Sequence, residues 1–146
     1  LREQMPELTG ATEWINEEVT MDELKGKATL IHFWSVSCHL CKEAMPEINE
    51  LRDEYDDDLN VIAVHMPRSE DDLDIGVIRS MAMGHDITQP IFVDSEHKLT
   101  EAFENKYVPA YYVFDEEGKL RHFQAGGSGM KMLKKRINRV LGIEEK

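Results

Sequence analysis

Apolar runs and amphipathic stretches alternate along most of the chain. Residues 29–34 form a short apolar run that follows the polar stretch 25–27 and precedes two small polar residues, Ser35 and Ser37. This pattern predicts a strand that is buried on both faces. In residues 40–55 the apolar positions recur at three- and four-residue spacing, which predicts an amphipathic helix directly after that strand.

The remaining pattern continues the alternation of strand and helix. We expect a second buried strand at residues 60–65, a helix that Ser69 caps and that runs to about Gly84, an extended piece at 90–93, a short helix at 98–104, a hairpin formed by 109–114 and 119–125, and a last helix after Gly129. This order predicts an α/β fold in which helices flank a central mixed β-sheet on both sides.

Composition and charge narrow the class of protein. The chain has 146 residues, and we expect it to form one domain over residues 1–146. Its 17 basic and 29 acidic residues give a net charge of −12, which disfavours binding to nucleic acid or to an anionic membrane. No apolar run approaches the ~20 residues of a membrane-spanning helix.

The start of the chain bears on the compartment. Six charged side chains in the first twenty residues do not fit a signal peptide: Arg2, Glu3, Glu7, Glu13, Glu17 and Glu18. We therefore expect a cytoplasmic protein. The first residue is Leu1 rather than Met, so removal of a leader or an anchor stays open as an alternative.

The only two cysteines, Cys38 and Cys41, lie three residues apart where the first buried strand gives way to a helix. Backbone N–H groups and the helix dipole at that position stabilise a thiolate on Cys38. Cys41 falls one turn later, within reach for a disulfide bond. We expect an exposed Cys38 sulfur that attacks a disulfide and a shielded Cys41 sulfur that completes the exchange.

A metal site is the main alternative for the cysteine pair. Cys38, Cys41 and His39 could serve a metal carrier, but the chain has no second Cys-x-x-Cys motif, and His39 lies within the pair. A haem attachment site requires a histidine after the second cysteine, where this chain has Lys42. Dithiol redox chemistry is therefore the favoured function.

Two segments together resemble the thioredoxin-like proteins. Phe33-Trp34, Cys38-x-x-Cys41 and Pro46 are similar to the active-site segment of that family. Tyr107-Val108-Pro109-Ala110 is similar to the segment that holds its cis-proline. The resemblance covers approximately residues 5–141. The extension before the first core strand is similar to that of the TlpA/ResA-type branch. This resemblance implies a thioredoxin fold with an N-terminal extension and a thiol-disulfide oxidoreductase. We expect a reductase, because a modestly stabilised Cys38 thiolate raises the potential of the pair only slightly.

The resemblance also implies roles for individual residues. Cys38 would be the nucleophile, Cys41 the resolving thiol, and Pro109 the cis-proline facing both sulfurs. The main chain of Val108 would pair with an extended protein substrate. Further substrate contacts are expected from Trp34, His39 and Leu40. The resemblance implies no cofactor, protein disulfides as substrates, an upstream reductase such as a thioredoxin reductase as electron donor, and a monomer.

Three departures from the thioredoxin pattern fall beside the cysteines. Ser37 replaces a tryptophan, and His39-Leu40 replaces Gly-Pro. His32 occupies the position of a buried acid. Two interpretations of His32 stay open: a core histidine bonded to a backbone carbonyl, or a base that takes the proton from Cys41. His39 is either solvated or lowers the pKa of Cys38 through partial positive charge.

Two further features concern the proton route and a competing activity. The loop of residues 66–70 follows the second strand, and Glu70 is a candidate active-site acid there.

A thiol peroxidase on the same fold is another alternative. That family requires a proline and a threonine or serine before its reactive cysteine. Ser35 fits the second requirement, but Ile31 stands where the proline should be.

Overall fold

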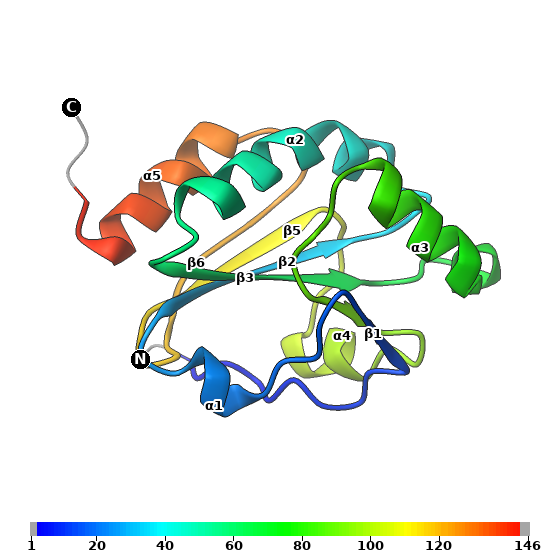
Figure 1. Cartoon of the computed structure of the whole chain (residues 1–146), viewed down its shortest axis with the longest axis horizontal. Coiled ribbons are helices and arrows are strands. Elements are labelled where there is room, and N and C mark those ends of the chain that lie inside the picture. The colour runs from blue at the N-terminus through cyan, green and yellow to red at the C-terminus, as the bar shows by residue number, and fades with distance from the viewer. Residues whose placement is uncertain (1–2, 144–146) are drawn as a thin grey trace.

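The sheet forms the centre of the fold (Figure 1). This computed structural model describes residues 3–143, and the sheet order in that range is β1-β4-β3-β2-β5-β6. The strands are β1 (Glu13–Ile15), β2 (Ala28–Trp34), β3 (Leu59–His65), β4 (Ile91–Val93), β5 (Ala110–Phe114) and β6 (Leu120–Ala125). The helices are α1 (Met21–Leu24), α2 (His39–Glu54), the 3-10 helix η1 (Glu70–Leu73), α3 (Ile75–Gly84), α4 (Lys98–Phe103) and α5 (Met130–Leu141).

Helices cover both faces of this mixed sheet, as the hydrophobic pattern predicted. Helices α2, α3 and α5 lie on one face, and α1 and α4 lie on the other (Figure 1). Strand β3 runs parallel to β2 and β4, whereas β5 runs antiparallel to β2. All residues of β2 are buried, because β2 lies in the middle of the sheet. The α/β thioredoxin-like fold is thereby confirmed.

The segment after β3 differs from the predicted helix between Ser69 and Gly84. It consists of two pieces, η1 and α3, separated at Asp74. The backbone of Asp74 is extended, and its side-chain carboxylate accepts hydrogen bonds from the N–H groups of Gly76 and Val77. Asp74 is thus the N-cap of α3, while Ser69 makes no side-chain capping bond. The break directs Asp72, in η1, toward the protein interior, where it is 2% exposed.

Two short elements before β2 were absent from the sequence expectations. Strand β1 pairs antiparallel with β4 and extends the sheet by one edge strand. Helix α1 begins with a capping box in which the Thr20 side chain accepts from the Glu23 N–H and the Glu23 side chain accepts from the Thr20 N–H. Neither element contains enough apolar residues for a clear periodic pattern.

Strands β2 and β3 end at the same edge of the sheet. Their parallel register pairs Trp34 with His65 and His32 with Ala63. Paired residues in parallel strands point to the same face, so Trp34, His65 and His32 all lie on the face that α2 and α3 cover. The loop from Ser35 to Cys38 continues from this edge into α2.

Candidate active site

Cys38 is the N-cap residue of α2, and Cys41 lies in its first turn. The two residues form a disulfide bond with their Cα atoms 5.3 Å apart. The backbone N–H of Cys41 donates a hydrogen bond to the Cys38 Sγ atom over 3.1 Å. The predicted position of the pair at the start of the helix is confirmed, and so is its ability to close a disulfide.

The expectation that Cys38 is exposed is wrong for this oxidised state. Cys38 is 3% exposed and Cys41 is 2% exposed. Both belong to one apolar cluster that also contains Val36, Trp34 and Met45. In the disulfide form, apolar neighbours therefore cover both sulfurs.

The segment that the family resemblance singled out lies against the cysteines. The peptide bond between Val108 and Pro109 is cis. Val108 packs against the apolar cluster that contains Cys38 and Cys41, and the Pro109 carbonyl accepts a hydrogen bond from the Gly126 N–H. Gly127 lies so close to Leu40 that a Cβ atom added at this glycine would be 3.0 Å from the Leu40 Cβ atom. The turn before α5 therefore flanks the Cys-x-x-Cys segment.

The structure places Trp34 and Glu70 differently from the expectation, and it leaves His39 exposed to solvent, as one of its two interpretations expected. Trp34 is 1% exposed, so it supports the active-site loop from beneath and offers no surface for substrate. The His39 side chain is 81% exposed and its Nε2 atom lies 2.6 Å from the Glu43 carboxylate. Glu70 is exposed at the start of η1, whereas the buried acid near the cysteine loop is Asp72.

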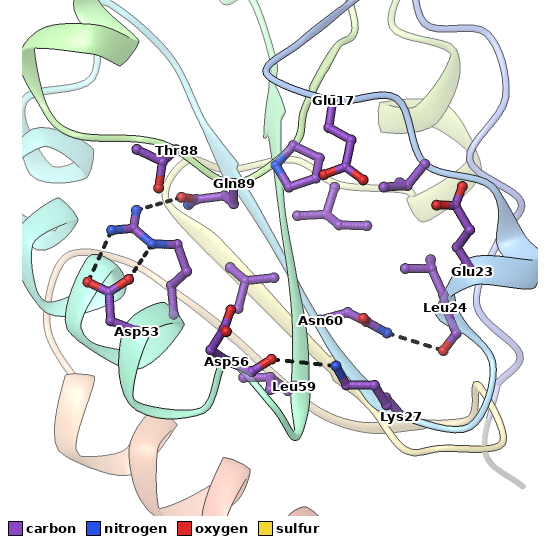
Figure 2. A pocket seen from close by; sticks show the side chains of 15 residues that line it. Glu17, Glu23, Leu24, Lys27, Asp53, Asp56, Leu59, Asn60, Thr88 and Gln89 are labelled. Atoms are coloured by element: carbon purple, nitrogen blue, oxygen red, sulfur yellow. Dashed lines mark hydrogen bonds and ion pairs between the residues drawn. The ribbon is translucent and has the colours of Figure 1, made fainter.

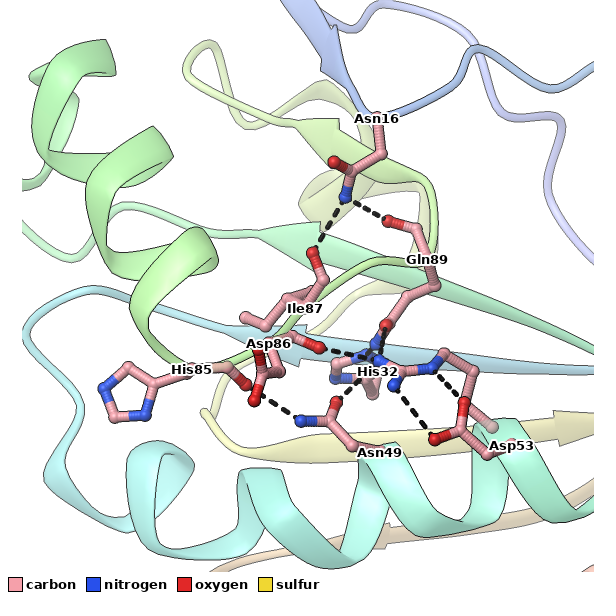
Figure 3. Close-up of polar contacts among 9 residues, drawn as sticks. Asn16, His32, Asn49, Asp53, His85, Asp86, Ile87 and Gln89 are labelled. Atoms are coloured by element: carbon pink, nitrogen blue, oxygen red, sulfur yellow. Dashed lines mark hydrogen bonds and ion pairs between the residues drawn. The ribbon is translucent and has the colours of Figure 1, made fainter.

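His32 belongs to a polar network in the layer between the sheet and α2 (Figure 3). Its Nε2 atom lies 2.8 Å from the Gln89 side-chain amide nitrogen. Arg52 donates to the Gln89 side-chain oxygen over 2.9 Å, to the Asn49 side chain and to the Asp86 carbonyl. The hydrogen bond from Arg52 to the Gln89 side-chain oxygen orients the amide so that its NH₂ group faces His32. The His32 partner is therefore a side-chain amide and not a backbone carbonyl.

This environment makes His32 a weak base. The Gln89 amide donates to Nε2, so that nitrogen is unprotonated and its lone pair is occupied. Burial, with a smaller contribution from the Arg52 guanidinium, lowers the pKa of His32 to about 3. Both observations favour a structural role for His32. A transfer of the Cys41 proton to His32 stays a prediction.

Asp72 carries a cluster of hydrogen bonds that the sequence did not reveal. One carboxylate oxygen, Oδ2, accepts bonds of 2.8 Å each from the Ser35 hydroxyl, the Ser37 hydroxyl and the Arg68 backbone N–H. Burial acts to raise the pKa of Asp72, but these hydrogen bonds and nearby His65 together hold it below its ordinary value. The carboxylate therefore stays charged near neutral pH and fastens the loop that leads to Cys38.

His65 supports the same loop from the end of β3. It is fully buried, and its Nε2 atom accepts a hydrogen bond from the Val36 N–H over 3.2 Å. Its ring meets the Trp34 ring edge to face, with 5.0 Å between centroids. Burial lowers the pKa of His65 to about 4, although Asp72 acts in the opposite direction. His65 and Asp72 thus hold the segment between Trp34 and Cys38 from below.

A separate pocket of about 430 Å³ opens near the start of β3 (Figure 2). Its lining includes Glu17, Arg52 and Asn60, and neither cysteine. Because β3 begins at Leu59 and ends at His65, this pocket lies at the other end of the strand from the disulfide. It plays no part in the redox site.

Among residues 3–143, no group of three or more His, Cys, Asp or Glu side chains is arranged to hold a metal ion. No helix within that range has the length and apolar character that crossing a bilayer requires.

The fold and the disulfide define a class of protein. A helix-capping Cys-x-x-Cys disulfide beside a cis-proline, on a thioredoxin-like sheet, is the arrangement of a thiol-disulfide oxidoreductase. Residues 1–123 match the model of the AhpC/TSA family, and the chain belongs to this family.

Individual relatives agree with this class. The chain is 73% identical to the thiol-disulfide oxidoreductase YkuV of Bacillus subtilis (strain 168) over 146 residues, which cover 99% of each protein. It is 26% identical to the thiol-disulfide oxidoreductase ResA of Bacillus cereus over 110 residues, 75% of this chain and 61% of that protein. The solution structure of a thioredoxin-like protein in the oxidised form superposes with a TM-score of 0.90 at 72% identity, covering 98% of each chain. This chain is a thioredoxin-like thiol-disulfide oxidoreductase.

Proposed function

We propose that this oxidoreductase reduces disulfide bonds in protein substrates, with Cys38 as the attacking thiol and Cys41 as the resolving thiol. The observation that carries this assignment is the hydrogen bond from the Cys41 N–H to the Cys38 Sγ atom at the start of α2. The same N–H stabilises a Cys38 thiolate once the disulfide is reduced, and the dipole of the 16-residue helix adds to it.

The reaction exchanges one disulfide for another. The Cys38 thiolate attacks one sulfur of the substrate disulfide, a mixed disulfide forms, and the other substrate sulfur leaves as a thiolate. The Cys41 thiol then loses its proton and attacks the Cys38 Sγ atom, which releases the second substrate sulfur. The protein ends as the Cys38–Cys41 disulfide, and the substrate has gained two electrons. Of the two protons on the substrate thiols, one balances the proton that Cys41 loses and the other comes from solvent.

The substrate contacts follow from the surroundings of the disulfide. We place an extended substrate segment against the main chain of Val108 and the Pro109 ring, with Leu40 on the opposite side. Leu40 is 48% exposed, and it contacts the turn at Gly127. Main-chain pairing gives affinity with little dependence on the substrate sequence. His39 lies on the outer rim, where its exposed side chain can meet polar groups of the substrate.

The remaining parts of the proposal concern partners and compartment. We propose that an upstream reductase such as a thioredoxin reductase restores the dithiol, and that the protein works as a monomer in the cytoplasm. A thiolate of modestly lowered pKa keeps the pair reducing, which suits a reducing compartment. The net charge of −12 opposes self-association.

Trapping of a mixed disulfide tests the order of the two thiols. Reduced Cys41→Ser protein is mixed with insulin, whose disulfides serve as the model substrate, and the products are mapped by mass spectrometry. We expect a stable adduct on Cys38, because the resolving thiol is missing, whereas the wild type releases reduced insulin. Cys38→Ser is the matched control and should form no adduct. Trapping by Cys38→Ser, without trapping by Cys41→Ser, would reverse the assignment.

A further inference from the structure

Arg68 lies over the residue that precedes Cys38. Its side chain is exposed, yet it makes two hydrogen bonds to Ser37. The Nη2 atom donates to the Ser37 carbonyl over 2.6 Å, and the Nε atom donates to the Ser37 hydroxyl over 3.1 Å. The guanidinium is always charged at physiological pH. It therefore holds a positive charge against the carbonyl of the peptide bond that joins Ser37 to Cys38.

Asp72 fixes this arrangement at two points. Its Oδ2 atom accepts from the Arg68 backbone N–H and from the Ser37 hydroxyl. The Ser37 hydroxyl thus donates to Asp72 and accepts from the Arg68 side chain. A third bond, from the Ser35 hydroxyl, anchors the same carboxylate to the end of β2. Asp72 is 2% exposed, and its bond from Ser35 is buried, whereas the bonds from Ser37 and Arg68 are partly buried.

Other charges near Cys38 do not supply the same effect. The titratable groups at the ends of the elements around it are His39, Lys42 and Glu43 in the first turns of α2, His65 at the end of β3, Glu70, Asp71 and Asp72 on η1, and Arg68 in the loop between β3 and η1. His39 forms an exposed ion pair with Glu43. His65 is neutral near pH 7, because burial lowers its pKa to about 4. The Asp72 charge is directed at three hydrogen-bond donors.

We propose that Arg68 and Asp72 are positioning residues that stabilise the Cys38 thiolate: Asp72 fixes Arg68 and Ser37, and Arg68 then places its charge beside the peptide that leads into Cys38. The inference rests on the proposed role of Cys38 as the attacking thiol. It assigns to Arg68 the electrostatic role that the sequence had suggested for His39. It also gives a reason for the inward turn of η1, which brings Asp72 under the loop.

The rate of alkylation as a function of pH tests the role of Arg68. The reduced protein is treated with iodoacetamide from pH 5 to pH 9, and labelling of each cysteine is measured by peptide mapping. We expect Arg68→Met to raise the pH midpoint of Cys38 alkylation by about half a unit. At pH values below this midpoint, the rate of alkylation should therefore be about threefold lower than in the wild type. Arg68→Lys should recover most of the shift, because it keeps the charge.

Arg121→Met is the matched control. It removes the same charge, but Arg121 lies at the start of β6 beside Asp115, far from the disulfide end of the sheet. An Arg68→Met midpoint equal to that of Arg121→Met would overturn the role of Arg68. First labelling of Cys41 in the wild type would instead contradict the proposed function, so the two failures are distinguishable.

A double-mutant cycle tests the contribution of Asp72. Asp72→Asn removes a negative charge, which by itself shifts the Cys38 midpoint. The informative quantity is therefore the additional shift that Arg68→Met causes in the Asp72→Asn variant. We expect this effect to be at most half of its size in the wild type, because Arg68 is no longer held. Ser37→Ala removes the hydroxyl that joins the Arg68 side chain to Asp72 and should reduce the Arg68→Met shift by a smaller amount, because the bond from Arg68 to the carbonyl of residue 37 remains. An undiminished shift in the Ser37→Ala background would overturn the positioning role, whether or not Asp72→Asn folds.

Discussion

His32 and His65 are two buried histidines on the same face of the sheet, on neighbouring strands, and they differ in their partners. His32 meets the Gln89 amide and lies near the Arg52 guanidinium, whereas His65 meets the Val36 N–H and lies close to the Asp72 carboxylate. Burial lowers both pKa values, but Arg52 lowers that of His32 further and Asp72 opposes the shift of His65.

The comparison separates two halves of one polar layer. The half around His32 connects β2, α2 and the segment before β4 and contains neither cysteine. The half around His65 holds the loop that carries Cys38. A buried histidine on this sheet face is therefore not by itself a sign of proton transfer, because the neighbouring groups decide its role.

The two histidines together should make the protein less stable in weak acid, and this is the largest effect that we expect. Their folded-state pKa values of about 3 and about 4 lie below the 6.5 of an unfolded histidine. The unfolded chain therefore binds more protons below about pH 6.5, and stability falls as the pH decreases. Between pH 7 and pH 5 we expect each histidine to lower the free energy of unfolding by about 2 kcal/mol.

Urea unfolding of the oxidised protein at a series of pH values measures this loss. In the same series, His32→Gln should lose the His32 part of the pH dependence and keep the part that belongs to His65. A free energy of unfolding that stays constant from pH 7 to pH 5 would contradict the neutral state of both histidines.

Replacement of His32 distinguishes its two interpretations. His32→Ala leaves a cavity and an unpaired Gln89 amide, so we expect the free energy of unfolding to fall by about 2–4 kcal/mol. Stopped-flow kinetics of mixed-disulfide formation and resolution should show both rates nearly unchanged. A proton relay predicts slower resolution with unchanged attack, and that result would restore the catalytic interpretation. His65→Ala is the comparison variant and should change the Cys38 attack rate, because Val36 loses its acceptor.

A smaller effect is expected from Ser35→Ala. This change removes one of three hydrogen bonds to Asp72 and leaves the bonds from Ser37 and Arg68 in place. We expect a loss of about 1–2 kcal/mol in the free energy of unfolding, measured by urea denaturation, with a folded structure retained. An unchanged free energy of unfolding would mean that the hydrogen bonds to Asp72 add little to the stability of the loop.

Local patterns were sufficient to predict the main strands and the redox pair. The apolar run before Cys38 and the helical spacing after it locate Cys38 at a helix start, and the structure agrees. The family resemblance supplied the cis bond before Pro109, which no local pattern encodes.

The support of the active-site loop could not be predicted in the same way. Glu70, Asp71 and Asp72 form one acidic run in the sequence, and only the break at Asp74 turns Asp72 rather than its neighbours inward. The partners of His32 and His65 come from segments 57 and 29 residues away along the chain. Such pairings depend on tertiary packing, although the small polar pair Ser35 and Ser37 was a signal that an acceptor lies nearby.

The midpoint potential of the Cys38–Cys41 pair tests most directly whether this protein is a reductant. A thiolate stabilises only the reduced state, so lowering the pKa of the attacking thiol by one unit relative to thioredoxin raises the potential at pH 7 by about 20 mV. From the thioredoxin value of about −270 mV, the expected midpoint is about −250 mV. Equilibration with glutathione buffers at pH 7, followed by alkylation and mass spectrometry, measures it. A midpoint near −250 mV agrees with the reductase, and one above about −180 mV would contradict it and favour an oxidase or an isomerase.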